Sequence, residues 1–239
     1  MIQLVVLLIV GFVAGMLSGA VGFGGGMILL PVITYFYGVE VAVPVSTIAQ
    51  LLSNLSRVVI GWKSIEWKSV GWFLLVALPC TALGAVGFAV VDKVLMTRVL
   101  CVGLIVFAIL KISGKIRLPK SRLTMLLGGG LTGGLNGLLG ISGPLSSAVF
   151  LSLDLLPVAY IASEATAAAA MHIVKIVVYG KLQLMNLTIF TEGFGIGCAM
   201  MFGNAIAMHF IRHIDKKKYQ KAVALLMIAV SLFLFITIK

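Results

Sequence analysis

The feature that most constrains this chain is a series of about ten apolar segments of helical length. They cover residues 2–18, 22–37, 42–60, 70–90, 96–112, 123–140, 144–158, 159–179, 188–209 and 220–238. Most reach the ~20 residues that a helix needs to cross a bilayer. Hydrophobic residues make up 61% of the 239, more than a soluble domain can bury. The sequence therefore predicts an all-α polytopic membrane protein without a soluble domain.

The first, second and seventh segments are short, and each borders a cluster of glycines. We expect some of them to be re-entrant half-helices, which leaves eight to ten segments. The start, MIQLVVLLIVGFVAG, lacks the basic leader and small-residue cleavage site of a secretory signal, so we expect it to be retained.

The net charge of +11 would favour a nucleic-acid partner in a soluble protein, but here the positions of the basic residues predict orientation. On one side of the predicted membrane, the loops carry twelve Lys and Arg residues, at Lys63 and Lys68, within 111–122 and within 212–221. Loops on the other side carry four, which are Lys93, Arg98, Lys181 and Lys239. We therefore expect an inner-membrane protein with the first side in the cytoplasm and both termini outside, and no nucleic-acid partner.

The two halves of the chain resemble each other. Residues 1–112 form one predicted transmembrane repeat, 113–122 a basic cytoplasmic linker and 123–239 a second repeat. An offset of 118 residues places Arg57 on Lys175 and Asn54 on His172 without a gap. Because each repeat holds an odd number of segments, the second enters the membrane from the opposite side. Such inverted repeats are common in secondary transporters, whose sites lie where the two halves meet.

Polar residues occur at helical spacing inside two of the apolar segments, one in each repeat. The third segment carries Ser46, Gln50, Asn54 and Arg57, and its counterpart carries Glu164, Ala168, His172 and Lys175. Spacings of four, four and three place each set on one face of a helix. Ionisable groups inside a membrane normally face the bundle interior, which makes these residues candidates for binding.

Arg57 and Lys175 together would suit an anion and repel a cation. Arg57 has an alternative interpretation, because it lies near the cytoplasmic end of its segment and a long side chain can reach the interface. Glu164 and His172 also allow two interpretations. They could form a proton relay that couples transport to protonation, or Glu164 could pair with a buried cation and only offset its charge.

The glycine-rich stretches GAVGFGGGM and GLLGISGPLSS lack the Lys and Ser/Thr of a nucleotide-binding P-loop at the required places. Each instead predicts a helix N-terminus with backbone N–H groups available to an anion. We assign this ligand role to Gly24, Gly25, Gly26, Ser142 and Gly143. Two stripes at spacing four are assigned to close helix packing, and they are Gly11, Gly15, Gly19, Gly129, Gly133 and Gly137.

Three other functional classes fit parts of the sequence. Residues 140–143 match the GxSG of intramembrane serine proteases, with Ser142 as nucleophile and His172 as base, but the motif is short in a glycine-rich chain. An anion channel or an assembly protein would also fit the composition. Cys80, Cys101 and Cys198 lie inside apolar segments and lack metal-ligand spacing, so we expect them to be buried and to bind no metal. We also expect no cofactor and no enzymatic activity.

The motifs GFVAGMLSGAVGFGGGMILLPVI and VSTIAQLLSNLSRVVIGWKSIEW resemble the TauE/SafE sulfite exporter family, also grouped as sulfonate permeases. A degenerate second copy follows in GGLTGGLNGLLGISGPLSSAVFL and ASEATAAAAMHIVKIVVYGKLQL. The resemblance implies transport of sulfite or an organosulfonate. A Thr-Ser pair is usual in the family where this chain has Ser46 and Thr47, and Glu164 in the second copy departs from that pattern.

We therefore expect a secondary transporter of a small sulfur-containing anion, most simply an exporter working by alternating access. Proton-coupled uptake of another small organic anion is the alternative. The oligomeric state stays open, a homodimer included.

Overall fold

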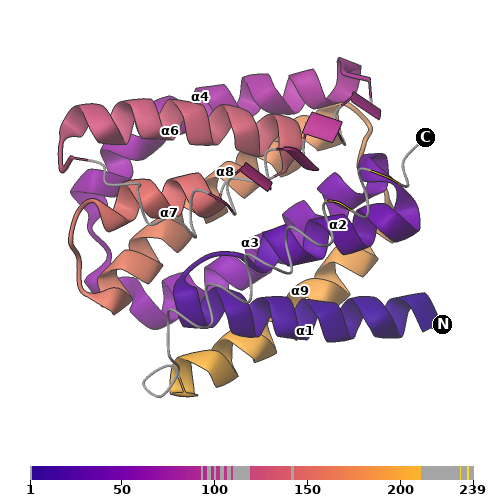
Figure 1. Ribbon diagram of the computed structural model, residues 1–239, viewed down its shortest axis with the longest axis horizontal. Coiled ribbons are helices and arrows are strands. Elements are labelled where there is room, and N and C mark those ends of the chain that lie inside the picture. The colour runs from indigo at the N-terminus through magenta and orange to yellow at the C-terminus, as the bar shows by residue number, and fades with distance from the viewer. Residues whose placement is uncertain are drawn as a thin grey trace.

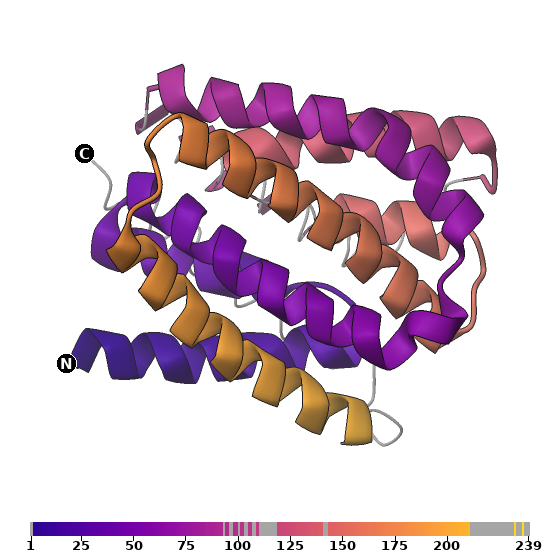
Figure 2. The ribbon, with the colours of Figure 1, turned by 180° about the vertical axis from the view of Figure 1, so that it is seen from behind.

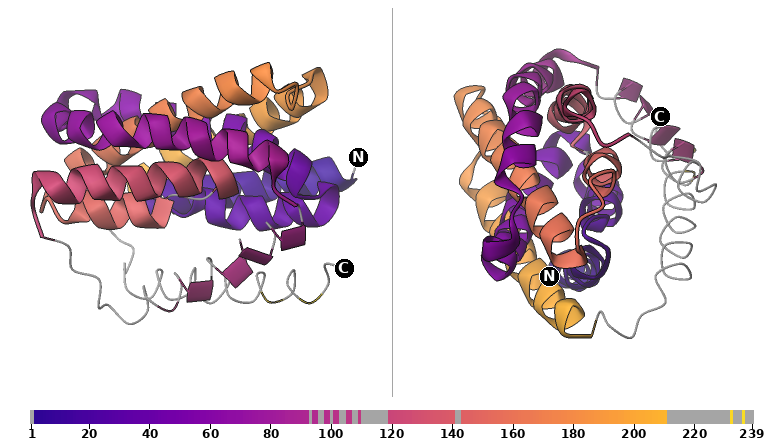
Figure 3. Two further views of the ribbon diagram at one scale, coloured as in Figure 1. Left: turned by 90° about the horizontal axis from the view of Figure 1, so that it is seen from above. Right: turned by 90° about the vertical axis from the view of Figure 1, so that its left-hand side faces the viewer.

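The computed structural model describes residues 2–92, 119–140 and 143–210, with scattered positions between 94 and 109 and at 232 and 236. Every regular element in these residues is helical, as predicted. The helices run roughly along one direction, so several are seen end-on in the right-hand panel of Figure 3. Most of the segments predicted at 96–112 and 220–238, and most of the 113–122 linker, lie outside the described residues.

Five of the described helices are long and apolar enough to cross a bilayer. They are α1 (Ile2–Val21), α3 (Val39–Gly61), α4 (Trp67–Val90), α8 (Pro157–Lys181) and α9 (Leu187–Phe210), all labelled in Figure 1. A further helix, α6 (Arg122–Leu139), has 18 residues. A 3-10 turn, η1 (Trp62–Ser64), follows α3. The expectation that the first segment is short is wrong, because α1 extends over 20 residues.

Two of the described α-helices are short. Helix α2 (Gly25–Tyr37) has 13 residues and α7 (Gly143–Leu151) has 9. At 1.5 Å per residue they are about 20 Å and about 14 Å long, so neither can cross a hydrocarbon core of ~30 Å alone. The seventh segment was predicted to continue to residue 158, but α7 ends earlier. Asp154 has a φ of 56°, which interrupts a helix, and Pro157 begins α8, where a proline is favoured.

The two stripes of glycine bring helices into close contact. Gly11, Gly15 and Gly19 on α1 lie against Ile196, Met200 and Asn204 of α9. In the same way, Gly129, Gly133 and Gly137 on α6 lie against Phe73, Ala77 and Thr81 of α4. A Cβ atom at Gly15 or Gly133 would overlap the facing backbone. The packing role predicted for these six glycines is confirmed.

Helices α3 and α8 pack against each other in the centre of the bundle, where Figure 2 shows them side by side. Helix α3 also packs on α2 and α9, and α8 packs on α7 and α4. In Figure 1, α1, α3 and α9 run from right to left, whereas α4, α6 and α8 run from left to right.

The turns after α1 and α6 have the same hydrogen bond. Gly22 and Gly140 have φ values of 86° and 73°, in the left-handed region that favours glycine. Their N–H groups donate to the carbonyl oxygens of Ser18 and Asn136 at 2.8 Å and 2.9 Å. These positions correspond at the offset of 118 residues.

Apolar side chains cover the outside of the bundle as well as its core. Val59, Leu83, Val90 and Leu156 are each more than 70% exposed, which suits lipid rather than water as the surroundings. Charged and amide side chains lie inside instead, among them Asn54, Arg57, Glu164, His172 and Lys175. The prediction of buried cysteines is correct for Cys101 and wrong for Cys80 and Cys198, which are partly exposed.

Candidate functional site

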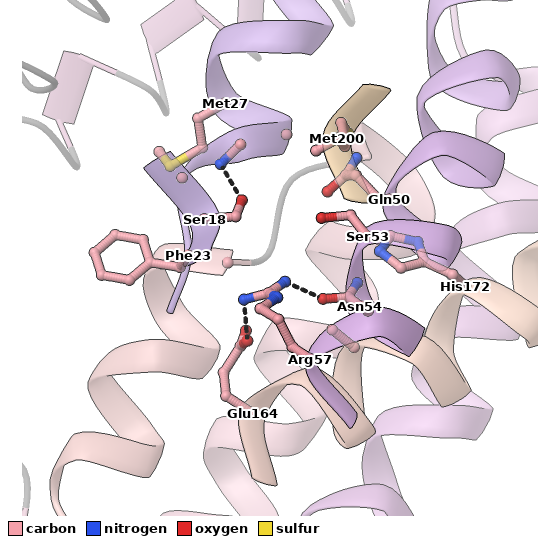
Figure 4. A pocket seen from close by; sticks show the side chains of 15 residues that line it. Ser18, Phe23, Met27, Gln50, Ser53, Asn54, Arg57, Glu164, His172 and Met200 are labelled. Carbon is pink, nitrogen blue, oxygen red and sulfur yellow. Dashed lines mark hydrogen bonds and ion pairs between the residues drawn. The ribbon is translucent and has the colours of Figure 1, made fainter. Parts of the chain in front are cut away.

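A pocket lies where the α1–α2 turn, α3, α8, α9 and the start of α7 meet, and Figure 4 shows it from close by. It brings together nine of the predicted residues, which are Gly24, Gly25, Gly26, Gln50, Asn54, Arg57, Gly143, Glu164 and His172. Six further residues complete the lining, namely Ser18, Phe23, Met27, Ser53, Ala168 and Met200. Ser46 and Lys175 do not line it, and Ser142 lies outside the described residues.

The regular spacing of α3 and α8 forms one wall. Gln50, Asn54 and Arg57 lie on one face of α3 because residues four and three apart project in the same direction. Glu164 and His172 share a face of α8 in the same way. Since α3 packs on α8, the two polar faces meet inside the bundle.

Arg57 is held in a buried network. Its Nη1 lies 3.7 Å from Oε2 of Glu164 and donates to the carbonyl oxygen of Gly22, while Nη2 donates to Oδ1 of Asn54. With 4% of its surface exposed, the side chain turns into the bundle. The alternative that Arg57 extends to the membrane interface is therefore wrong.

Glu164 is anchored from a third helix. Its Oε1 accepts a hydrogen bond of 2.6 Å from the hydroxyl of Ser146 on α7. The carboxylate is thus fixed beside Arg57, and the two opposite charges offset each other where burial would make either one costly. Figure 4 shows Glu164 and Asn54 on either side of the guanidinium.

The starts of the two short helices meet at the pocket. A Cβ atom at Gly143 would lie 3.5 Å from the Cβ of Phe23 and 3.8 Å from the backbone N of Gly24. Both helix N-termini therefore direct their positive dipole ends toward one region. One of the backbone donors is already engaged, because the N–H of Gly25 donates to the hydroxyl of Ser18 at 3.0 Å.

Several buried polar atoms of the lining have no hydrogen-bond partner in the described structure. They are Nε2 of Gln50, Nε of Arg57, Nδ1 of His172 and Oε2 of Glu164. A buried donor without a partner costs about 1–3 kcal/mol. The N–H groups of Gln50 and Arg57 are therefore available to a ligand that accepts hydrogen bonds.

The second predicted cation lies apart from this pocket. Lys175 is fully buried, and its Nζ donates to Oδ1 of Asn136 on α6 at 3.4 Å and lies 5.7 Å from the ring centre of Tyr179. Ser46 uses its hydroxyl to donate to the carbonyl oxygen of Val43 at 3.0 Å. The structure thus brings Arg57, but not Lys175 or Ser46, to the pocket.

Sequence reasoning missed Ser18 and Met200. Ser18 has a detectable signal, since it lies seven residues before Gly25 and directly precedes the glycine block, where a hydroxyl can bind a free N–H group at the helix start. Met200 reaches the pocket from α9 through tertiary packing, which no local pattern indicates.

Residues 7–234 match the family described as sulfite exporter TauE/SafE. The match covers nearly the whole chain, and the chain therefore belongs to this family of membrane transporters, as the sequence motifs predicted. No curated protein and no solved structure matches the chain.

Proposed function

We propose that this member of the sulfite exporter TauE/SafE family carries sulfite or an organosulfonate outward across the inner membrane by alternating access. The observation that carries the proposal is the buried guanidinium of Arg57 beside the starts of α2 and α7. A tetrahedral or pyramidal oxyanion would accept hydrogen bonds from Arg57, Gln50 and those backbone N–H groups at the starts of α2 and α7 that are not already bonded.

The charges of the pocket favour an anion over a cation. Arg57 and two helix N-termini are positive, and Glu164, the one carboxylate among the described lining residues, is already bound by Arg57 and Ser146. A cation would have to approach the guanidinium without a free carboxylate as its ligand. An anion would instead replace Glu164 as the partner of Arg57.

The proposed mechanism requires two inverted halves. Three observations support this arrangement: the close pairs α1–α9 and α6–α4, the opposite directions of α1 and α6 in Figure 1, and the matching turns at Gly22 and Gly140. In this view α2 and α7 are re-entrant half-helices that start near the middle of the membrane. Broken helices at the junction of inverted repeats are a typical place for a transporter's substrate site.

The proposed orientation follows from the basic residues. Lys63 lies in η1, Lys68 in the first turn of α4, Lys120 just before α6 and Arg122 at its start, whereas Lys181 ends α8. In Figure 1, α4 and α6 start at the left-hand end of the bundle and α8 ends at the opposite end. We place the left-hand end in the cytoplasm and both chain termini outside. Outward movement of one negative charge is then favourable by ~2.3 kcal/mol per 100 mV, so export needs no coupling ion.

Proton-coupled uptake of a small organic anion is a second candidate, and the Arg57–Glu164 ion pair favours it. A proton on Glu164 would weaken the hold of this carboxylate on Arg57 and free the guanidinium for a substrate. One proton would thereby enter with one anion. His172 lines the same pocket and is a second group that could take up the proton.

The experiment that tests the proposal is a thermal-shift screen of the purified protein, followed by flux in liposomes. The panel contains sulfite, sulfate, thiosulfate, sulfoacetate, taurine and plain carboxylates. We expect sulfite or a sulfonate to raise the melting temperature and to be transported, because a ligand that binds only the folded state stabilises it. A wild-type protein that binds and transports none of these anions would refute the proposal.

A further inference from the structure

Lys175 is a buried cation outside the pocket just described. Its exposed fraction is 0%, and it lies in the last third of α8, a helix long enough to cross a membrane. Its partners are weak ones: the amide oxygen of Asn136 at 3.4 Å and the face of Tyr179. A neutral amide and an aromatic ring offset little of the cost of burying an ammonium.

The described residues offer Lys175 no carboxylate. Their one ion pair joins Arg57 to Glu164. Of their other acidic side chains, Glu40, Asp92 and Asp154 are exposed, and Glu66 and Glu192 are partly exposed. The positive charge of Lys175 is therefore left without a fixed counter-ion in the part of the chain that the structure describes.

Two further hydrogen-bond donors lie on α6, the helix that carries Asn136. Nδ2 of Asn136 and Oγ1 of Thr132 are buried and have no hydrogen-bond partner in the described structure. Both residues are fully buried, and they are one helical turn apart on α6. The hydroxyl of Tyr179 is already engaged, since it donates to the carbonyl oxygen of Gly137 at 3.0 Å. The ammonium of Lys175, the free amide N–H of Asn136 and the free hydroxyl of Thr132 are donors of the kind that bind an oxyanion.

This group is the counterpart of the first pocket. The offset of 118 residues places Asn136 on Ser18 and Lys175 on Arg57, and Ser18 and Arg57 both line that pocket. In the second half, the corresponding polar residue Asn136 accepts a hydrogen bond from the corresponding cation Lys175. Among the described residues, Arg57 has an acidic partner, Glu164, whereas Lys175 has none.

We propose that Lys175, Asn136 and Thr132 form a second binding station for the same oxyanion, which is closed in this conformation. This inference rests on the proposed function. The anion binds first at Arg57 and then at Lys175, and the second station opens when the two halves of the protein move relative to each other. Lys175 thus supplies the charge that draws the anion through the second half of its path.

The test compares binding and flux in Lys175→Met and Asn136→Asp. Both variants are purified, titrated with sulfite and with a sulfonate in a thermal-shift assay, and assayed for flux in liposomes. Asn136→Asp places a carboxylate beside Lys175, so it provides an internal counter-ion and should keep the fold intact. Lys181→Met is the matched control, since it removes an exposed lysine from the end of the same helix. Arg57→Gln reports on the first pocket.

We expect both variants to bind the anion within about threefold of wild type and to lose roughly tenfold or more in flux. Wild-type flux in either variant, measured on folded protein, would overturn the second station. Loss of binding equal to that of Arg57→Gln would also overturn it, because Lys175 would then belong to the first pocket. If wild type itself neither binds nor transports these anions, the proposed function fails, and the second station fails with it.

Discussion

Arg57 on α3 and Glu164 on α8 form an ion pair across the centre of the bundle, with 3.7 Å between Nη1 and Oε2. In the proposed function, Glu164 occupies the position at Arg57 that an anionic substrate would take. An anion that binds Nη1 of Arg57 must compete with a carboxylate that Ser146 holds in place. This competition leads to the first two predictions.

Glu164→Gln should bind a sulfonate roughly tenfold more tightly than wild type, because the competing charge is removed. Without ligand the variant should melt at a lower temperature, since Arg57 loses its counter-ion and a buried unpaired charge is destabilising. The ligand should then raise the melting temperature more than it does in wild type. Glu40→Gln, which changes an exposed acidic residue at the start of α3, is the control and should match wild type.

The same pair predicts how binding depends on pH. A proton on Glu164 releases Arg57, so wild type should bind a sulfonate more tightly as the pH falls. A sulfonate is the suitable probe because its own charge is constant across the neutral range. Glu164→Gln should lose most of this dependence, and His172→Gln separates the contribution of the other titratable group in the lining. A profile in Glu164→Gln as steep as that of wild type would contradict competition by this carboxylate.

A double variant separates the structural role of Arg57 from its role in binding. Arg57→Gln alone leaves Glu164 buried without its counter-ion and should destabilise the fold by about 3–5 kcal/mol. Adding Glu164→Gln removes the second charge and should restore much of the melting temperature. Binding and flux should stay absent in the double variant. Their recovery together with stability would show that Arg57 only offsets Glu164.

The residues that α3 and α8 contribute to the pocket wall could largely be predicted from the sequence, but the complete set of lining residues could not. A helix fixes the direction of residues four apart, so spacing alone predicts that Gln50 and Asn54 share one face of α3. That Lys175 lies against Asn136 instead depends on how α6 packs beside α8. Ser18 and Met200 join the pocket through contacts that a single-segment pattern does not contain.

Gly26→Ala should weaken anion binding, because a Cβ atom at this position would overlap the amide of Gln50. The amide would have to move out of the pocket, and one donor to the ligand would be lost. Gly180→Ala is the matched control, since no atom lies within 4 Å of its Cβ position on α8. We expect unchanged binding there and stability equal to wild type or higher by about 0.5–1 kcal/mol. Equal sulfonate affinity in Gly26→Ala and wild type would argue against a role for Gln50.

The packing of α6 on α4 can be tested with adjacent glycines. Gly133→Ala forces a methyl group against the backbone of Ala77 and should cost about 1–3 kcal/mol of stability. Gly134→Ala should leave stability equal to wild type or higher by about 0.5–1 kcal/mol, because no atom lies within 4 Å of that Cβ position. Melting temperatures of the two purified variants provide the measurement. Equal values would contradict the close α6–α4 contact.

The most direct test of the central claim is sulfite and sulfonate flux through purified protein in liposomes, compared between wild type and Arg57→Gln. Lys63→Gln, which changes a residue in the turn after α3, is the control for the loss of a positive charge. Saturable flux in wild type and in the control, driven by a membrane potential and absent from Arg57→Gln, is the predicted result. Undiminished flux in folded Arg57→Gln would contradict the assignment of the site.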